Sequence, residues 1–592
     1  MKLKSLIVVS MLCTASAFAV PPPQYGSNTQ NQTSPMATNV APFASWSPGW
    51  VLADTFPKAR DWIPVACDFS GQNVGSLDLD DQRWVRSLGA NQCATTNIYY
   101  DQAGHYPAGE YTLLFEGEGT FVAGPEDNEV FYTTGMETET HNGLKKLTFT
   151  VNQATQNQSG IGFFLMAQET DYIRNIRLIS PGGVCGRSET ELDRFRFCAT
   201  SRGGTGQCNV DEQCYDMEDV YFDRFTDTQA DMETKVVFHP EYIKHYQPYT
   251  AIRYMKWSRP EDSTVVTWND RVTMSEAMFT LEDRGFPYEY MIAMSNQLNA
   301  DAYFNIPVLA DDPYIIAYGA QVSSQLRSTL DVHIEYGNEF FNELQAVPYS
   351  HALTQANLVG SGIPSTDSDL VKVAKWSSRE AVRVMNLWQA QFATPSRVSK
   401  VIAGFNPIPE YTLAALDFNN SYTQIDALAM SGYIGPDRRF VDDQTRFDNL
   451  TVNEVFEEIT DGRHLNSGAS LVDLNAVYQT AYGWASTRNL DLILYEAGQH
   501  IVSTGAPQST TNVMLQANRD SQMGTAYTNN FNQFRSANGT LMFHFLVEDM
   551  WNANGSFGLI EHQNDDTQSS PKYQAIMNFI NNNPCWWTGC GH

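Results

Sequence analysis

Two glutamates stand where they could act as a pair of catalytic carboxyl groups. Glu339 follows the apolar segment 332–336, and Glu496 ends the apolar segment 492–495. If both segments are buried parallel strands of a barrel, their carboxyl ends meet at one face and bring the two side chains together. Retaining hydrolysis of a glycosidic bond needs two carboxyl groups about 5–5.5 Å apart, one to protonate the leaving oxygen and one to attack the anomeric carbon. The sequence therefore predicts Glu339 as the acid/base and Glu496 as the nucleophile.

Motifs of other enzyme classes are missing from the sequence. There is no GxSxG, HExxH or GxxxxGK[ST], and Gly117-Glu118-Gly119 is followed by Val122 where a dinucleotide-binding loop needs a third glycine. The paired CxxC and nearby histidine of a structural zinc site are also missing. The acids Asp211, Asp216 and Asp219 offer oxygen ligands for calcium, although acidic loops are usually only solvated. We expect no metal and no cofactor.

A strand-and-helix alternation over residues 236–580 would position the two glutamates. Short apolar segments alternate with helical patterns, which is typical of a parallel sheet with helical crossovers. The segment 40–46 would supply one further strand, the first in chain order, and so complete an α/β fold of the (β/α)8 barrel type. We expect the other seven strands at 250–255, 302–306, 332–336, 401–405, 427–431, 492–495 and 541–545, and helices at 288–298, 369–392, 474–485 and 512–534.

Residues 99–181 interrupt this pattern with short alternating segments such as 111–115, 147–151 and 161–166, separated by Gly, Pro, Asn and Asp. That spacing predicts an inserted β-sandwich of jelly-roll type. Residues 40–98 would then carry the first strand and the start of the barrel, and residues 182–235 a disulfide-rich irregular connection.

The N-terminus and the cysteines indicate export. Residues 1–19 combine two lysines, a short apolar run and Ala17-Phe18-Ala19, which predicts a signal peptide, and residues 20–39 look like a flexible leader. The apolar run is too short for a membrane anchor. Eight cysteines remain after cleavage, and proximity favours pairing Cys585 with Cys590 in the tail 581–592 and pairing within the group from Cys185 to Cys214. We expect a secreted protein, extracellular or periplasmic.

Composition narrows the partners further. Acidic residues outnumber basic residues 67 to 37, and removal of the two signal-peptide lysines leaves a net charge of −32. Such a surface repels nucleic acid and anionic lipid heads. The expected partner is a polysaccharide or oligosaccharide, with uncharged or weakly charged sugars favoured.

The ordered set of motifs resembles clan A glycoside hydrolases, the retaining (β/α)8-barrel superfamily. The resemblance covers roughly residues 236–580 and rests on the Asn338-Glu339 pair after the fourth strand and on Glu496 after the seventh. It implies that Asn338 binds the sugar 2-hydroxyl, that Arg253 supports the nucleophile and that Tyr433 donates a hydrogen bond to it. An aromatic platform is expected after the eighth strand, where Trp551 is a loose match.

The whole chain also resembles exported bacterial proteins loosely labelled cellulose-binding. The shared features are the tryptophan-rich start from Trp46 to Trp62, the Glu-Gly-Glu-Gly turn at 116–119 and the Gly-Asn-Glu strand end. A non-catalytic carbohydrate-binding protein that uses the sandwich and the barrel cleft is therefore the alternative function, and a structural or adhesion protein is a third.

Three further side chains complete the expectations for the site. His500 and His544 would line the sugar pocket, although His544 lies inside an apolar run that is more typical of a core histidine. Glu335 has the same strand parity as Glu339, and a buried carboxylate there needs a positively charged partner, so we predict that it pairs with an arginine.

Overall fold

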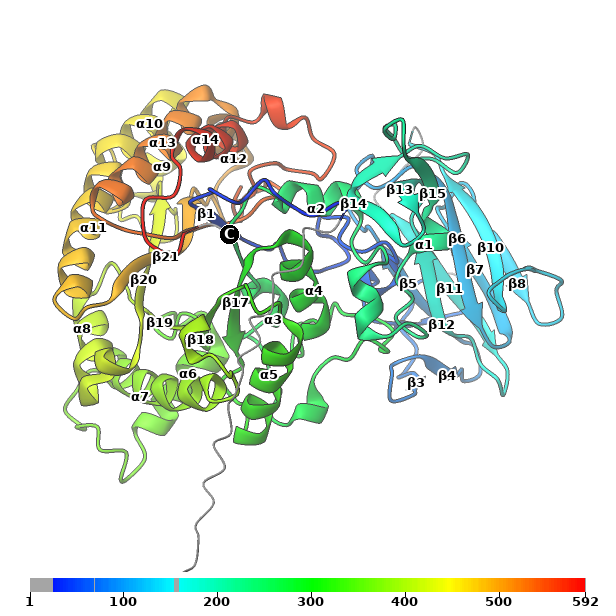
Figure 1. Ribbon diagram of the computed structural model, residues 1–592, viewed down its shortest axis with the longest axis horizontal. Coiled ribbons are helices and arrows are strands. Elements are labelled where there is room, and N and C mark those ends of the chain that lie inside the picture. Colours follow the sequence, from blue (N-terminus) through cyan, green and yellow to red (C-terminus); the bar gives the residue numbers. More distant parts are fainter. Residues whose placement is uncertain (1–24, 69, 154–158, 591–592) are drawn as a thin grey trace, which may run out of the picture.

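A closed barrel of eight parallel strands forms the larger part of the molecule (Figure 1). The computed structural model describes residues 25–68, 70–153 and 159–590; the predicted signal peptide at 1–19 lies outside them. The strand order around the barrel follows the chain, so the (β/α)8 prediction is confirmed. The strands are β1 (Met36–Asn39), β16 (Ala251–Arg253), β17 (Asp301–Ile306), β18 (Val332–Tyr336), β19 (Val398–Ala403), β20 (Ala427–Ile434), β21 (Asp491–Gln499) and β22 (Met542–His544).

Apolar side chains on both faces of these strands explain why the barrel forms. Small and aromatic residues such as Ala37, Ala251, Tyr303 and Phe543 fill its interior. The outer faces pack against amphipathic helices, and together they bury the largest apolar cluster of the chain. These helices include α2 (Pro240–Tyr246), α4 (Tyr288–Leu298), α5 (Asp312–Gln325), α6 (Ala346–Ala356), α7 (Asp369–Gln389), α8 (Pro409–Asp417), α10 (Val452–Asp461), α11 (Leu471–Ser486), α12 (Gln508–Arg519), α13 (Ser521–Ser536) and α14 (Pro571–Asn582); shorter ones are α3 (Met255–Ser258) and α9 (Gln444–Asp448). Helix α1 (Met217–Val220) packs instead in an apolar cluster outside the barrel, with residues such as Leu114 and Val184.

The first barrel strand differs from the prediction. It is Met36–Asn39, not residues 40–46, and all four of its residues are buried. Thr38 is paired with Ile252 on one side and with His544 on the other, so this short strand closes the barrel. The leader predicted for 20–39 is therefore wrong over 36–39. A four-residue strand half made of polar residues gives too weak an apolar pattern to be seen in a run rich in Asn, Gln, Ser and Thr.

The β-sandwich lies between β1 and β16 in the chain and stands beside the barrel in Figure 1. One antiparallel sheet has the order β12-β6-β10-β9 and the other the order β2-β5-β11-β7-β8. The sandwich starts with β2 at Ile63, well before the predicted boundary at 99; β2 has only four residues, and four of the seven residues of β5 are Gln, Thr or Asn. Its strands are β2 (Ile63–Ala66), β5 (Gln92–Ile98), β6 (Gly109–Glu116), β7 (Gly119–Gly124), β8 (Val130–Thr133), β9 (Glu139–His141), β10 (Leu144–Val151), β11 (Ile161–Gln168) and β12 (Arg174–Ile179), with a small hairpin of β3 (Asp78–Leu79) and β4 (Val85–Ser87).

Residues 182–235 are more regular than predicted. They contain a three-stranded antiparallel sheet of β13 (Gly183–Ser188), β14 (Glu191–Cys198) and β15 (Gln213–Asp216). Disulfides Cys185–Cys208 and Cys198–Cys214 cross-link this sheet, while Cys67–Cys93 lies in the sandwich and Cys585–Cys590 in the tail. The pairings that proximity favoured are therefore present. Of the helices in the described part of the chain, none combines the length and hydrophobicity needed to cross a bilayer.

Candidate active site

A cavity of about 670 Å³ opens at the carboxyl ends of the barrel strands. Glu339 and Glu496, the two predicted catalytic residues, both line it, and Asn338 and Tyr433 lie beside them. The carboxyl end of the strands is the face where barrels of this type carry their active sites. The other lining residues are Pro42, Trp46, Arg60, Tyr100, Asp101, Met255, Lys256, Gln345, His500, Phe545, Leu546, Asp549, Met550, Asn552, Asn554, Gly555 and Phe557.

Glu496 is held rigidly at the floor of this cavity. Its Oε1 accepts a hydrogen bond from Arg253 Nη1 at 2.7 Å and its Oε2 accepts one from the Tyr433 hydroxyl at 2.7 Å. Burial raises the pKa of Glu496 above its ordinary value; the Glu339 charge adds to the rise, whereas Arg253, Tyr433 and Lys256 oppose it. The two donors fix the orientation of a carboxylate that lines the cavity.

Glu339 occupies a sharp turn directly after β18. Gly337 and Glu339 both have left-handed backbone, with φ of 66° and 37°. A non-glycine residue rarely adopts that conformation, and such strain is concentrated at functional sites. Three donors hold its carboxylate: the Tyr495 hydroxyl on Oε1 at 2.8 Å, and Asn342 Nδ2 and Gln345 Nε2 on Oε2 at 2.9 and 3.0 Å.

An irregularity in β21 allows one strand to serve both glutamates. Along β20 the pairing moves from Met430 with Leu494 to Ser431 with Glu496, so Tyr495 is an extra residue without a partner in that register. The pairing of β21 with β22 shifts at the same place. Consecutive residues of a regular strand point to opposite faces, whereas a bulge re-aims them. Tyr495 therefore reaches Glu339 while Glu496 reaches Arg253.

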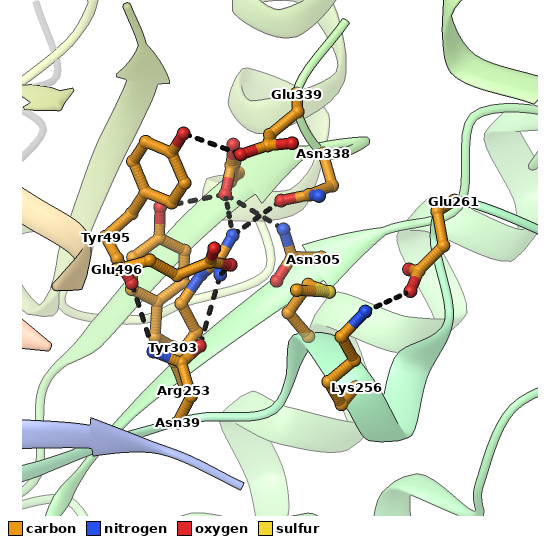
Figure 2. A network of polar contacts seen from close by, with 12 residues as sticks. Asn39, Arg253, Lys256, Glu261, Tyr303, Asn305, Asn338, Glu339, Tyr495 and Glu496 are labelled. Atoms are coloured by element: carbon orange, nitrogen blue, oxygen red, sulfur yellow. Dashed lines mark hydrogen bonds and ion pairs between the residues drawn. The ribbon is translucent and has the colours of Figure 1, made fainter. Parts of the chain in front are cut away.

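Arg253 is the centre of the polar network shown in Figure 2. It is fully buried, and besides Glu496 it donates from Nη2 to Glu335 Oε2 at 3.0 Å and to Asn338 Oδ1 at 2.8 Å, and from Nη1 to Asn39 Oδ1 at 3.1 Å. The prediction that Glu335 pairs with an arginine is confirmed. Because a guanidinium presents several donors in a planar fork, one side chain can orient both Glu496 and Asn338, the residue before Glu339.

Glu335 forms a second layer beneath this arginine. Tyr303 donates its hydroxyl to Glu335 Oε2 at 2.9 Å, and Asn305 Nδ2 donates to the same oxygen at 2.9 Å. The side chains of Glu335, Tyr303 and Asn305 are all buried. The charge of Arg253 is balanced by two carboxylates, Glu335 and Glu496, and each of them also accepts hydrogen bonds from other side chains. Burial raises the pKa of Glu335, and Arg253 opposes the rise.

The remaining predicted site residues divide into one that lines the cavity and two that do not. His500 lines it, with its ring centroid 5.0 Å from that of Tyr433. His544 is fully buried, and its Nε2 faces the Tyr527 hydroxyl at 3.4 Å, behind the cavity wall. Contrary to the prediction, His544 is not among the residues that line the cavity.

Trp551 is also misassigned as the sugar platform. Its indole N–H donates to the Gly558 carbonyl at 3.1 Å, and Lys572 Nζ lies 3.9 Å from its ring centroid. It is absent from the residues that line the cavity, whereas Phe545, directly after β22, and Phe557 are among them. The aromatic wall after the eighth strand is thus formed by phenylalanines and not by the expected tryptophan.

Sequence reasoning did not assign Tyr495, Asn342, Gln345 or Asp549 to the site. The first three hold Glu339, and no motif marks them because tyrosine and amide residues are common after strands. Asp549 lines the cavity, and burial raises its pKa to about 7. Its position directly after Glu548 near the eighth strand was the only available signal.

Apart from the disulfide-bonded cysteines, two groups of potential metal ligands among the described residues lie outside this cavity, and one of them is His141, Glu218 and Asp219. In the other, His105, His562 and Asp565 each offer one ligand atom, and these atoms lie within 4.8 Å of one another. The calcium candidates Asp211, Asp216 and Asp219 do not form one group with each other among the described residues, because only Asp219 belongs to such a group; Asp211 is instead paired with Arg187 at 3.0 Å.

Comparisons with known proteins give fold likeness only. No family model and no curated protein matches the chain. Similar solved structures include a 4-O-α-L-rhamnosyl-β-D-glucuronidase from Fusarium oxysporum 12S (11% identity, TM-score 0.34, 56% of this chain and 61% of that chain), so less than two thirds of that protein's length is spanned. Others are a GH51 arabinofuranosidase from Xanthomonas axonopodis pv. citri (11%, 0.33, 59% and 67%) and a Bacteroides ovatus GH5 xyloglucanase (10%, 0.32, 86% and 100%).

These similar structures are glycoside hydrolases, the class that the sequence resembles. Identities of 8–11% and TM-scores of 0.30–0.34 across the similar structures give no basis for transferring an activity or a substrate. The fold of this chain is established by its own closed ring of eight parallel strands, and its chemistry must be argued from its own side chains.

Proposed function

We propose that this chain is a retaining glycoside hydrolase in which Glu496 is the nucleophile and Glu339 the acid/base. One observation carries the proposal: two carboxylates from β21 and from the turn after β18 face one cavity, and Glu496 is oriented there by Arg253 and Tyr433. Retaining hydrolysis needs such a pair, with one group fixed for attack and the other able to exchange a proton.

In the first half of the reaction Glu339 gives a proton to the glycosidic oxygen while a Glu496 oxygen attacks the anomeric carbon. The bond from that carbon to the leaving oxygen breaks, and an ester to Glu496 forms. Arg253 and the Tyr433 hydroxyl keep the attacking carboxylate in position. Donors that are already oriented need no reorganisation as charge moves during the reaction.

In the second half Glu339, now ionised, takes a proton from a water molecule. The water oxygen attacks the anomeric carbon, the ester bond to Glu496 breaks, and Glu339 is left protonated for the next cycle. The Tyr495 hydroxyl at 2.8 Å from Glu339 Oε1 suits both stages, because a hydroxyl can donate to a carboxylate or accept from a carboxylic acid.

The substrate proposed is a polysaccharide or a fragment of one, met outside the cytoplasm. A net charge of −30 for the whole chain favours uncharged sugars over polyanions. Four disulfides support an oxidising compartment. Asn338, the residue before the acid/base, accepts from Arg253 at 2.8 Å and is proposed to bind the sugar 2-hydroxyl.

The test is azide rescue of two alanine variants. On a polysaccharide or aryl glycoside that the wild type cleaves, Glu496→Ala and Glu339→Ala should each lose hydrolysis by several orders of magnitude. Azide should restore turnover in both variants. The product should be a glycosyl azide of inverted configuration in Glu496→Ala and of retained configuration in Glu339→Ala. Glu343→Ala, which changes an exposed glutamate four residues along the chain, is the matched control and should keep wild-type turnover.

Two results would overturn the proposal. Full activity of either variant would remove the corresponding glutamate from the mechanism. Binding of polysaccharides by the wild type with no release of product from any of a broad panel would instead favour a non-catalytic carbohydrate-binding protein.

A further inference from the structure

We infer that the β-sandwich side of the molecule adds a sugar-stacking subsite to the candidate active-site cavity, formed by Trp46 and Tyr100. This inference rests on the proposed function and narrows its substrate to a chain of several sugar units. Both side chains line the cavity that contains Glu339 and Glu496. Neither belongs to a barrel strand: Trp46 lies in the connection between β1 and the sandwich, and Tyr100 follows strand β5 of the sandwich.

The exposure of these two rings is the first argument. Trp46 and Tyr100 are each 41% exposed, whereas most aromatic side chains of the chain are buried. Isolated exposed aromatics are common on protein surfaces, but two that face the same cavity form an apolar wall. The opposite faces of a pyranose ring carry C–H groups, and a flat indole or phenol ring buries them without needing a hydrogen bond.

The second argument is that neighbouring residues hold the ring of Tyr100 in place. The Arg60 guanidinium lies 4.5 Å from its ring centroid, an arrangement that fixes the plane of the ring. The two residues that flank Tyr100 have left-handed backbone, with φ of 58° at Tyr99 and 62° at Asp101. The turn carries Tyr100 at the cavity, and non-glycine residues keep such a conformation only where surrounding contacts enforce it.

Those contacts come from the connection between β1 and the sandwich and from the loop after β22. Gln102 Nε2 donates to the Trp46 carbonyl at 2.6 Å, which ties the turn to the second aromatic residue. The ring of His105 stacks on that of His562 with centroids 3.5 Å apart, and its Nδ1 is 2.8 Å from Asn564 Oδ1. The segment 99–105 is therefore attached to the loop after β22, so the subsite is ordered before a ligand arrives.

Polar groups around the aromatic wall match the hydroxyl groups of a sugar. Asp101, Lys256 and Asn554 line the same cavity and offer both donors and acceptors. The ring that reacts is enclosed by residues from the barrel strand ends. The sugar ring that stacks on Trp46 and Tyr100 is then a neighbouring unit of the same polysaccharide. Only substrates that extend from the cleaved bond as far as this subsite gain binding energy there.

The test compares long and short substrates in single variants. Trp46→Ala and Tyr100→Ala are measured on the neutral polymer that the wild type cleaves best among hydroxyethylcellulose, xylan, glucomannan and agarose, and on its shortest cleavable oligosaccharide. Each variant should lose about 3- to 10-fold in kcat/KM on the polymer, with a clearly smaller loss on the short substrate. Tyr100→Phe, which keeps the ring, should retain most of the wild-type kcat/KM on the polymer.

Phe131→Ala is the matched control, because Phe131 is a 49% exposed aromatic residue of the same sandwich that does not line the cavity. It should behave as the wild type on both substrates. Equal losses on long and short substrates, or wild-type kinetics in both alanine variants, would overturn the subsite.

Binding separates this inference from the proposed reaction. Retardation of the protein in native gels that contain the same polymers should weaken in Trp46→Ala and Tyr100→Ala and remain in Phe131→Ala. If the wild type binds a polymer but cleaves nothing, the proposed hydrolysis fails while this pattern still supports the subsite. If retardation is unchanged in both alanine variants, the subsite fails whatever the activity.

Discussion

Tyr495 and Glu496 are consecutive residues, yet their side chains contact residues on opposite sides of the candidate site. The Tyr495 hydroxyl donates to Glu339 at 2.8 Å, and Glu496 accepts from Arg253 at 2.7 Å. Both belong to β21 at the point where its pairing with β20 shifts by one residue. The positions of the two carboxylates are therefore linked through one peptide unit of a buried strand, which is a stiffer connection than two independent loops would provide.

Removal of the Tyr495 hydroxyl should lower turnover without unfolding the protein. In Tyr495→Phe, Glu339 keeps Asn342 and Gln345 as donors but loses the hydrogen bond on Oε1. A hydrogen bond to a charged group contributes about 1.5–3 kcal/mol, so we expect kcat to fall about 10- to 100-fold. Steady-state kinetics check this expectation, with Tyr482→Phe on helix α11 as the control; an unchanged kcat would show that the hydroxyl does not position Glu339.

The pH dependence of activity should respond to Tyr433. Its hydroxyl stabilises the ionised form of Glu496, whose pKa is already raised by burial. Tyr433→Phe removes this donor, so the pKa of Glu496 should rise further and a larger fraction of Glu496 should be protonated at a given pH. The acidic limb of the kcat/KM profile should therefore move to higher pH. An acidic limb that stays in place would assign it to another group.

Arg253 should be as important for stability as for chemistry. Its replacement by methionine leaves Glu335 and Glu496 buried without their shared cation. Breaking a buried ion pair from one side typically costs about 3–5 kcal/mol, and we expect a loss of that order in the free energy of unfolding measured with urea. Arg463→Met removes a half-exposed arginine and should change it by less than about 0.5 kcal/mol. Wild-type stability of Arg253→Met would contradict the network.

Glu548 should make the protein less stable as the pH rises. It is fully buried, and burial raises its pKa to about 8 from an ordinary value of 4.5. Between these two pH values the folded chain holds a proton that the unfolded chain has lost, so the free energy of unfolding falls as the pH increases through this window, by up to about 1.4 kcal/mol per pH unit. Glu548→Gln abolishes this contribution.

Urea unfolding at several pH values tests this expectation. The stability of Glu548→Gln relative to the wild type should increase between about pH 5 and pH 8, whereas that of the exposed variant Glu137→Gln should not. A difference that is independent of pH would show that Glu548 is ionised to the same extent in the folded and unfolded chains.

Much of the barrel could be predicted from the sequence, because its strands are continuous apolar segments separated by amphipathic helices. Seven of the eight strands overlap their predicted ranges, including β18 at exactly the predicted residues 332–336. β1 was misplaced because Thr38 and Asn39 are buried polar residues. Their hydrogen bonds and their pairing with β16 and β22 cannot be inferred from the local pattern of hydrophobic residues.

The sequence predicted the site residues whose side chains directly follow the end of a strand. It did not predict those whose direction depends on a bulge or on packing against the core. Glu339, Glu496, Arg253 and Tyr433 lie together as strand positions suggest. Tyr495 would face away from the site in a regular strand. His544 and Trp551 were misassigned because residue type alone does not reveal whether a ring faces a cavity or the core behind it.

The position of β1 constrains the order in which the molecule can fold. This strand is made first during synthesis, but its partners are residues 251–253 and 542–544. The intervening sandwich has its own antiparallel sheets and apolar core, so it can fold from residues that are already available. The barrel cannot: its ring stays open until the last strand arrives from more than 500 residues away, and contacts of such long sequence separation form slowly. The candidate active site should therefore form late, once β22 has joined the barrel.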